Sequence, residues 1–125
     1  MRILIDTQIF IWAVIDSEKL DAQARRIMLE ATEVFVSSAS IWEIAIKTRL
    51  GKLEGNPNEF AQAIVQSGFR EIAVTARHAA KVYDLPPYHR DPFDRLLIAQ
   101  AISEPLRLMT ADKALARYSE LVMTV

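Results

Sequence analysis

The sequence of 125 residues contains no cysteine and only two histidines, His78 and His89. The absence of cysteine excludes disulfide bonds, thiolate zinc sites and cysteine nucleophiles. Two histidines are also too few for a metal centre that is rich in histidine. Any chemistry in this protein must therefore depend mainly on other side chains.

The chain also lacks an excess of either charge, with 15 Lys and Arg residues against 16 Asp and Glu residues. A domain that holds nucleic acid by bulk charge alone is expected to be more basic than this, so any contact with nucleic acid must come from a local site. An acid stands already at position 6, too early for a signal peptide. No apolar run approaches the roughly 20 residues that span a bilayer. We therefore expect a cytoplasmic protein that does not bind membranes.

Hydrophobic residues make up 51% of the chain, which is enough for the core of one domain over residues 1–125. Short β-branched and aliphatic runs alternate with longer helical patterns. The runs predict strands at residues 3–5, 34–36, 72–74, 106–109 and 121–125. Because these runs are continuous rather than alternating, the strands should be covered on both faces. The pattern predicts an α/β fold with a mainly parallel sheet and helices on both sides.

Capping residues mark the starts of several helices. Asn56 and Asp91 each precede a proline, which suits the first helical position, and Thr75 precedes another helical pattern. Ser40 and Glu43 have the spacing of a capping box, in which each side chain bonds the backbone of the other. We therefore expect helices to begin directly after these positions.

Two aspartates follow predicted strands closely. Asp6 ends the first strand, and Asp112 comes shortly after the fourth. Because the carboxyl ends of parallel strands meet at one edge of a sheet, where ligands bind, we expect both carboxylates at that edge. Each could instead cap the helix that follows it, since aspartate accepts hydrogen bonds from exposed helix amides. Both roles stay open at this point.

Glu43 lies in an apolar stretch between Trp42 and Ile44. A carboxylate in such surroundings must be paired, protonated or bound to a cation. Lys47, one helical turn later, is the ordinary partner for it. A ligand role for Glu43 therefore competes with an ion pair and with the capping box.

The run from His89 to Ala101 places two acids, two arginines and a proline at the start of an apolar helix. Asp91 is expected to cap this helix, with Pro92 in the first turn. Asp94 then lies in the first turn, where the helix dipole favours an anion. Because one cap already serves the helix, Asp94 is the better candidate for a ligand.

The basic side chains of the same run have two interpretations. Arg90 and Arg95 either hold phosphate oxygens or neutralise Asp91 and Asp94. His89 is interpreted as a loop residue, although its ordinary pKa would suit a general acid.

If these acids converge, their like charges disfavour joint ionisation unless a cation is present. Such oxygen ligands suit Mg²⁺ or Mn²⁺, and a site of this kind can activate a water for attack on phosphorus. Ser38 and Thr110 could orient the acids or the water, or could serve only turns and caps.

Four segments together match the motifs of a known family, in the family's order. They are Leu4-Ile5-Asp6-Thr7, Ser40 to Lys47, His89 to Ala101 and Leu108 to Asp112. They resemble the motifs of PIN-domain ribonucleases, in particular the VapC-like toxins of bacterial toxin–antitoxin pairs. The resemblance spans nearly the whole chain, and the third segment is the most specific.

The resemblance implies a single PIN domain with a three-layer α/β/α sandwich. It also implies a Mg²⁺- or Mn²⁺-dependent endoribonuclease that hydrolyses phosphodiester bonds of a structured RNA by metal-activated water. Further expectations are a homodimer and a small antitoxin protein whose tail covers the active site. The alternative is a catalytically inactive PIN-fold module that binds RNA or protein, against which the presence of all four family acids argues.

Position by position, the resemblance assigns the catalytic and metal-binding roles to four acids, Asp6, Glu43, Asp94 and Asp112. Secondary candidates are Asp91, Thr7, Ser38 and Thr110. Candidates for contacts to phosphate or RNA are Arg90, Arg95 and Lys47. The chain departs from many relatives at Gln8, where histidine is common, and at Ala111, where arginine is common. The second departure removes one potential phosphate contact.

Overall fold

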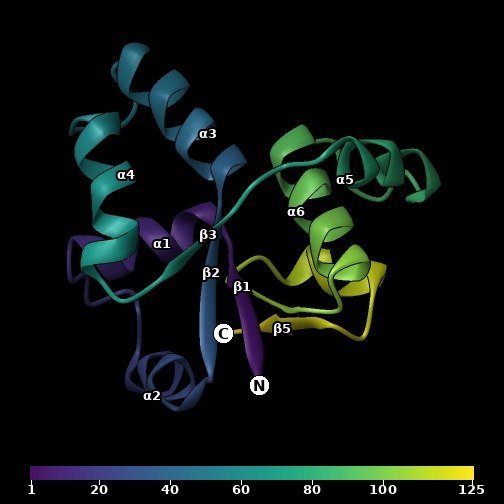
Figure 1. The fold of residues 1–125 in the computed structure, drawn as a ribbon, viewed down its shortest axis with the longest axis horizontal. Coiled ribbons are helices and arrows are strands. Elements are labelled where there is room, and N and C mark those ends of the chain that lie inside the picture. The colour runs from purple at the N-terminus through teal and green to yellow at the C-terminus, as the bar shows by residue number, and fades with distance from the viewer.

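The computed structural model describes residues 1–125 and contains one five-stranded sheet in which every strand is parallel to its neighbours (Figure 1). The strand order is β3-β2-β1-β4-β5. The strands are β1 (Arg2–Ile5), β2 (Glu33–Ser37), β3 (Arg70–Ile72), β4 (Arg107–Thr110) and β5 (Val122–Thr124). The α/β class with a parallel central sheet, expected from the sequence, is therefore confirmed.

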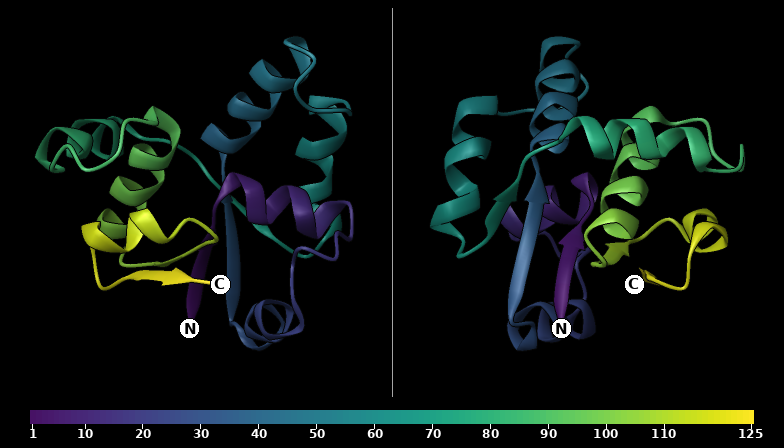
Figure 2. Two further views of the ribbon diagram at one scale, coloured as in Figure 1. Left: turned by 180° about the vertical axis from the view of Figure 1, so that it is seen from behind. Right: turned by 45° about the vertical axis from the view of Figure 1, so that its right-hand side comes forward.

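Helices cover both faces of this sheet and make the fold a three-layer α/β/α sandwich. The α-helices are α1 (Thr7–Val14), α2 (Ala22–Glu30), α3 (Ser38–Arg49), α4 (Pro57–Gln66), α5 (Ala76–Lys81) and α6 (Pro92–Ser103). Two short 3₁₀ helices are η1 (Val82–Asp84) and η2 (Lys113–Tyr118). Helices α1 and α4 lie on one side of the strands and α6 on the other, as the views in Figures 1 and 2 show.

The central strand β1 separates two apolar cores. Ile3 and Ile5 belong to the core that includes Ile64 of α4, whereas Leu4 belongs to the core that includes Leu97 of α6. All three strand residues are completely buried. Because successive side chains of a strand point to opposite faces, a strand covered on both sides must be apolar at every position. This explains the continuous apolar run near the N-terminus.

The helix caps expected at Asn56, Thr75 and Asp91 are all present, because each side chain accepts a hydrogen bond from a backbone amide of the first turn. The prediction of a capping box between Ser40 and Glu43 is wrong. Helix α3 begins earlier, at Ser38, and its cap is Ser37, whose hydroxyl accepts a hydrogen bond from the amide of Ala39 at 3.1 Å. Ser40 therefore lies inside the helix.

Strand β3 lies at Arg70–Ile72 rather than at residues 72–74. It is an edge strand, paired on one side only, with Arg70 opposite Phe35 of β2. An edge strand has one side open to solvent and needs fewer apolar residues than a central one. Arg70 instead forms an ion pair with Glu33 of β2. The apolar pattern, which begins at Ile72, therefore marked the strand two residues too late.

The two tryptophans differ in their surroundings. Trp12 is partly buried and packs against the core. Trp42 has 62% of its surface exposed and is not a core residue. It contacts Phe93 edge to face, with ring centroids 5.2 Å apart. None of the helices is both long and apolar enough to cross a membrane.

Candidate active site

The carboxyl ends of β1 and β4 bring Asp6 and Asp112 to the same edge of the sheet. The two strands are parallel neighbours, with Ile5 opposite Met109. The amide of Asp6 donates a hydrogen bond to the carbonyl of Met109 at 3.0 Å, which continues the ladder to the end of the strand. Asp112 follows only two residues after β4 ends. The expected placement of these acids at one edge is therefore confirmed.

A pocket of about 310 Å³ opens at this edge, and all four candidate acids line it. Asp6 and Asp112 cap α1 and η2, Asp94 lies in the first turn of α6, and Glu43 lies further along α3. The full lining is Asp6, Thr7, Gln8, Ile11, Glu43, Lys47, Asp91, Asp94, Ala111 and Asp112. Five carboxylates thus face a single basic side chain, that of Lys47.

Asp6 caps α1 and also lines the pocket beside the other acids. One carboxylate oxygen, Oδ1, accepts a hydrogen bond from the amide of Ile9 at 2.9 Å. The side chain is buried, and burial is the main reason why the pKa of Asp6 rises to about 6. The charges of Asp94 and Glu43 raise the pKa further, while the hydrogen bonds to Asp6 lower it.

Two buried hydroxyls support the acids. The hydroxyl of Thr110 donates to Oδ2 of Asp6 at 2.6 Å and accepts a hydrogen bond from the amide of Asp112 at 3.0 Å. It therefore joins the acid after β1 to the segment after β4. The hydroxyl of Thr7 donates to the hydroxyl of Ser40 at 2.8 Å, which ties the start of α1 to α3.

Glu43 is buried, with 7% of its surface exposed, and only one of its carboxylate oxygens has a partner. Oε2 lies 2.8 Å from Nζ of Lys47, the ion pair that the spacing of the two residues allowed. The hydrogen bond to Glu43 raises the pKa of Lys47. Oε1 is buried without any hydrogen-bond partner. A buried carboxylate oxygen without a donor is costly, so this oxygen is suited to a further cationic ligand.

Asp91 takes the capping role expected of it, and Asp94 takes no part in that cap. Asp91 caps α6 by accepting hydrogen bonds from the amides of Phe93 at 2.8 Å and of Asp94 at 3.0 Å. The Asp94 carboxylate makes no such cap bond. Burial, and next the charge of Asp91, raise the pKa of Asp94 above its ordinary value, while the hydrogen bond from His89 lowers it.

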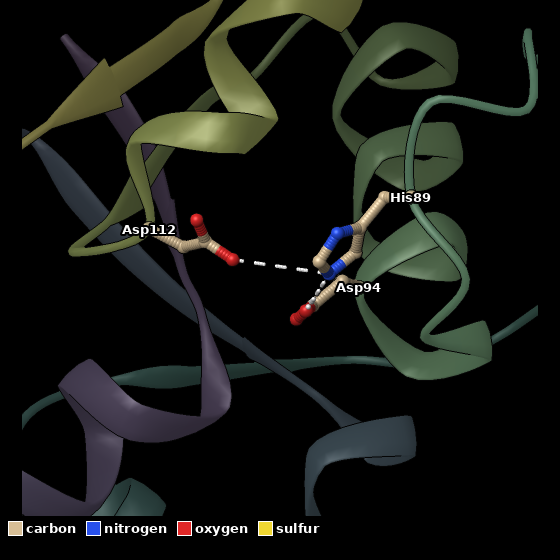
Figure 3. A group of neighbouring side chains, drawn as sticks. All are labelled: His89, Asp94 and Asp112. Atoms are coloured by element: carbon tan, nitrogen blue, oxygen red, sulfur yellow. Dashed lines mark hydrogen bonds and ion pairs between the residues drawn. The ribbon is translucent and has the colours of Figure 1, made fainter.

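His89 is the residue of the site that the sequence analysis missed. Its ring Nε2 lies 3.0 Å from Oδ2 of Asp94 and 3.8 Å from Oδ2 of Asp112, so it stands between the two acids (Figure 3). Asp112 also caps η2, because its Oδ1 accepts a hydrogen bond from the amide of Ala114 at 3.0 Å. The sequence signals for His89 were its ordinary pKa and its position at the start of the most specific family segment, and neither placed its ring between the acids.

Two other candidates, Arg95 and Ser38, make their hydrogen bonds away from the acids. The guanidinium of Arg95 pairs with neither Asp91 nor Asp94. It donates instead to Tyr118 and to loop carbonyls, among them that of Pro86 at 2.9 Å. Of the two interpretations of Arg95, the ion pair with Asp91 or Asp94 is therefore wrong, and the donors of Arg95 already have acceptors within the protein. The hydroxyl of Ser38 accepts a hydrogen bond from the amide of Val74.

Arg90 is exposed and makes no hydrogen bond or ion pair, so its side chain is free to contact a ligand. Lys47 lines the pocket and pairs there with Glu43, and its ammonium group has three hydrogens to donate. These two side chains therefore remain the candidates for contact with an anionic ligand.

The fold and the pocket define an α/β protein with an acidic site at the carboxyl edge of a parallel sheet, suited to a hard divalent cation. A family model described as the PIN domain matches residues 3–121, and the chain belongs to this family.

Solved structures share the fold at low sequence identity. VapBC2 from Rickettsia felis, bound to a DNA fragment from its promoter, has 17% identity and a TM-score of 0.69 over 100% of this chain and 98% of that chain. A toxin–antitoxin complex from Klebsiella pneumoniae has 18% identity and a TM-score of 0.68, covering 97% and 95%. VapC20 of Mycobacterium tuberculosis, described as a sarcin-ricin loop cleaving toxin, has 17% identity and a TM-score of 0.62, covering 94% and 97%. No curated protein sequence matches the chain.

Proposed function

We propose that this protein is a Mg²⁺- or Mn²⁺-dependent endoribonuclease, the toxin of a toxin–antitoxin pair, which hydrolyses phosphodiester bonds of a structured RNA. The observation that carries the proposal is the gathering of Asp6, Glu43, Asp94 and Asp112 around one pocket. Membership of the PIN family supports it, as does the similarity to a toxin described as cleaving the sarcin-ricin loop.

The residues of the pocket fit a divalent cation. The unpartnered Oε1 of Glu43 is a buried acceptor with no donor, and burial together with neighbouring acids raises the pKa of Asp6 to about 6. Glu43 thus has one oxygen that Lys47 does not neutralise, and Asp6 has acids but no cation among the causes of its pKa shift. The donors are carboxylate oxygens, the ligands that Mg²⁺ and Mn²⁺ prefer. In the proposal, Asp6, Glu43, Asp94 and Asp112 hold the ion.

The ion, when bound, supplies positive charge that makes a water more acidic and offsets the charge of the scissile phosphate. The protein's own contribution is to fix the acids. Thr110 orients Asp6 through its hydroxyl, and the cap formed by Asp91 fixes the first turn from which Asp94 projects. Arg90 is the free guanidinium nearest in sequence to this turn, and we assign it to a contact with the RNA backbone.

The partners in this proposal are a small antitoxin that covers the pocket and a second copy of the chain. Two of the similar structures are toxin–antitoxin complexes, which supports the first partner. Exposed apolar side chains on α3 and at its C-cap, namely Trp42, Ile46 and Leu50, support the second. Sedimentation of the purified chain checks the homodimer, because a single species with the mass of one chain would contradict it.

The test of the activity is cleavage of structured RNAs by the purified chain with MgCl₂ or MnCl₂ and with excess chelator. The wild type should cut only with the metal. Asp94→Asn should lower the rate by at least about 100-fold, because a metal site contributes several kcal/mol to the transition state. The matched control is Asp84→Asn, an exposed acid outside the pocket that pairs with Lys81, and it should cut like the wild type.

Equal cleavage by the wild type and by Asp94→Asn, or cleavage that chelator does not stop, would show a contaminating nuclease. RNA binding without cleavage by the wild type, in every metal, would favour the alternative of an inactive binding module.

A further inference from the structure

The position of His89 among the acids carries an inference that rests on the proposed metal-dependent function and deepens it. Nε2 of His89 and one carboxylate oxygen each from Asp94 and Asp112 all lie within 4.8 Å of one another (Figure 3). Ligands about 2.1 Å from one ion in octahedral geometry lie about 3 Å from each other in adjacent positions and about 4 Å in opposite ones. The three atoms are therefore spaced nearly as ligands of a single ion would be.

A second observation at the same pocket also points to a cation. Oε1 of Glu43 belongs to a side chain with 7% of its surface exposed and has no hydrogen-bond partner. Glu43 lines the pocket together with Asp94 and Asp112. The acids of this pocket are thus more than a group of surface carboxylates, because Glu43 is buried and one of its oxygens has no hydrogen-bond donor.

The backbone of His89 is held in place by residues distant in sequence. Its amide donates to the hydroxyl of Tyr118 at 2.7 Å, and its carbonyl lies 3.4 Å from Nη1 of Arg95. Arg95 also donates to the Tyr118 hydroxyl at 3.1 Å, so the backbone of His89, the Tyr118 hydroxyl and the Arg95 guanidinium contact one another. An ordinary loop histidine would not need this support. The loop presents one ring nitrogen to the acids in a fixed position.

The imidazole can act as a ligand through Nε2. The other ring nitrogen, Nδ1, has no partner in the protein, so it can carry the ring's hydrogen and leave the lone pair of Nε2 free. A cation between His89 and the carboxylates would replace the hydrogen bond from Nε2 to Asp94. Carboxylate oxygens suit Mg²⁺ and Mn²⁺ alike, whereas an imidazole nitrogen suits transition metals and not the hard Mg²⁺ ion.

We propose that His89 is a nitrogen ligand of the metal site and makes the site prefer Mn²⁺ to Mg²⁺.

The test is calorimetric titration of the full chain with MnCl₂ and with MgCl₂, in the wild type, His89→Ala and His89→Gln. The glutamine amide keeps a donor for Asp94 near the position of Nε2 but removes the imidazole. Both variants should lose about tenfold or more in Mn²⁺ affinity and should change Mg²⁺ affinity by less than about threefold. Thermal melts in chelator check that each variant is folded.

Spectroscopy on bound Mn²⁺ provides a readout that is independent of activity and of affinity. Pulsed electron paramagnetic resonance of the wild type should show a coupling to a directly bound ¹⁴N nucleus, and His89→Gln should lack it. The proposal would be overturned if His89→Ala lost affinity for Mn²⁺ and Mg²⁺ equally and His89→Gln kept the wild-type affinity for both. His89 would then only orient Asp94. That result leaves metal-dependent cleavage standing, whereas a wild type that binds neither ion overturns the proposed function as well.

Discussion

Replacing Asp6 by asparagine should stabilise the metal-free protein at neutral pH, although it removes a buried charged group. The folded state raises the pKa of Asp6 from 3.8 to about 6, chiefly by burial. A folded state that holds a proton more tightly than the unfolded chain is most stable when the group is protonated. The stability that the protein has with Asp6 protonated is therefore fully present below about pH 4 and is lost as the pH rises through about 6.

The size of the effect follows from the same values. Because one pKa unit corresponds to about 1.4 kcal/mol, ionised Asp6 lowers the free energy of unfolding by about 3 kcal/mol above pH 6. Asparagine has nearly the same shape and no charge. Its amide can keep the cap bond from Ile9 and a hydrogen bond with Thr110. Asp6→Asn should therefore gain up to about 3 kcal/mol at pH 7.5 and almost nothing at pH 4.

Urea unfolding at several pH values, in chelator, measures this difference. The matched control is Asp21→Asn, which changes an exposed aspartate that caps α2 through the amide of Ala24 at 2.8 Å. Asparagine and aspartate cap equally well, so the control should change the free energy of unfolding by less than about 0.5 kcal/mol. A destabilised Asp6→Asn protein at pH 7.5, or a difference that does not depend on pH, would refute the reasoning about burial and charge.

Three further outcomes are expected. Thr110→Val removes the hydroxyl that lowers the pKa of Asp6, so an NMR titration of the Asp6 carboxyl carbon should show a pKa above the wild-type value; urea unfolding should show a loss of about 1–3 kcal/mol. Arg95→Ala should cost about 2 kcal/mol or more, since it strips donors from several loop carbonyls. Arg90→Ala, an exposed neighbour without such bonds, should stay within about 0.5 kcal/mol of the wild type. Adding MnCl₂ should raise the melting temperature of the wild type by mass action, and chelator should reverse the rise.

The sequence predicted those features of the fold that depend on local rules. Helix caps at Asn56, Thr75 and Asp91 follow from side chains that bond the amides next to them in the chain. The meeting of Asp6 and Asp112 at one edge follows from the parallel topology, which needs only the order of strands and helices. Both inferences required no knowledge of distant contacts.

The features that the sequence did not predict depend on residues far apart in the chain. His89 reaches the acids because Tyr118, 29 residues later, holds its amide, and no local pattern encodes that bond. Ser40 has the spacing of a cap, but Ser37 already caps α3, and the Ser40 hydroxyl bonds Thr7, 33 residues away. For Arg95 the sequence left open a phosphate contact or an ion pair with Asp91 or Asp94, yet its guanidinium donates to backbone carbonyls of the segment before α6.

In the proposed function, the carboxylate pocket directs a water, rather than a ribose hydroxyl, at the phosphorus of RNA. Analysis of the products distinguishes the two nucleophiles, with an RNA cut in MnCl₂ and its new ends identified by mass spectrometry. Attack by water should leave one hydroxyl end and one phosphate end without any 2′,3′-cyclic phosphate, and cleavage should persist when the ribose at the cut carries a 2′-O-methyl group. A cyclic phosphate product, or complete loss of cleavage on methylation, would contradict it, because both require attack by the neighbouring 2′-hydroxyl.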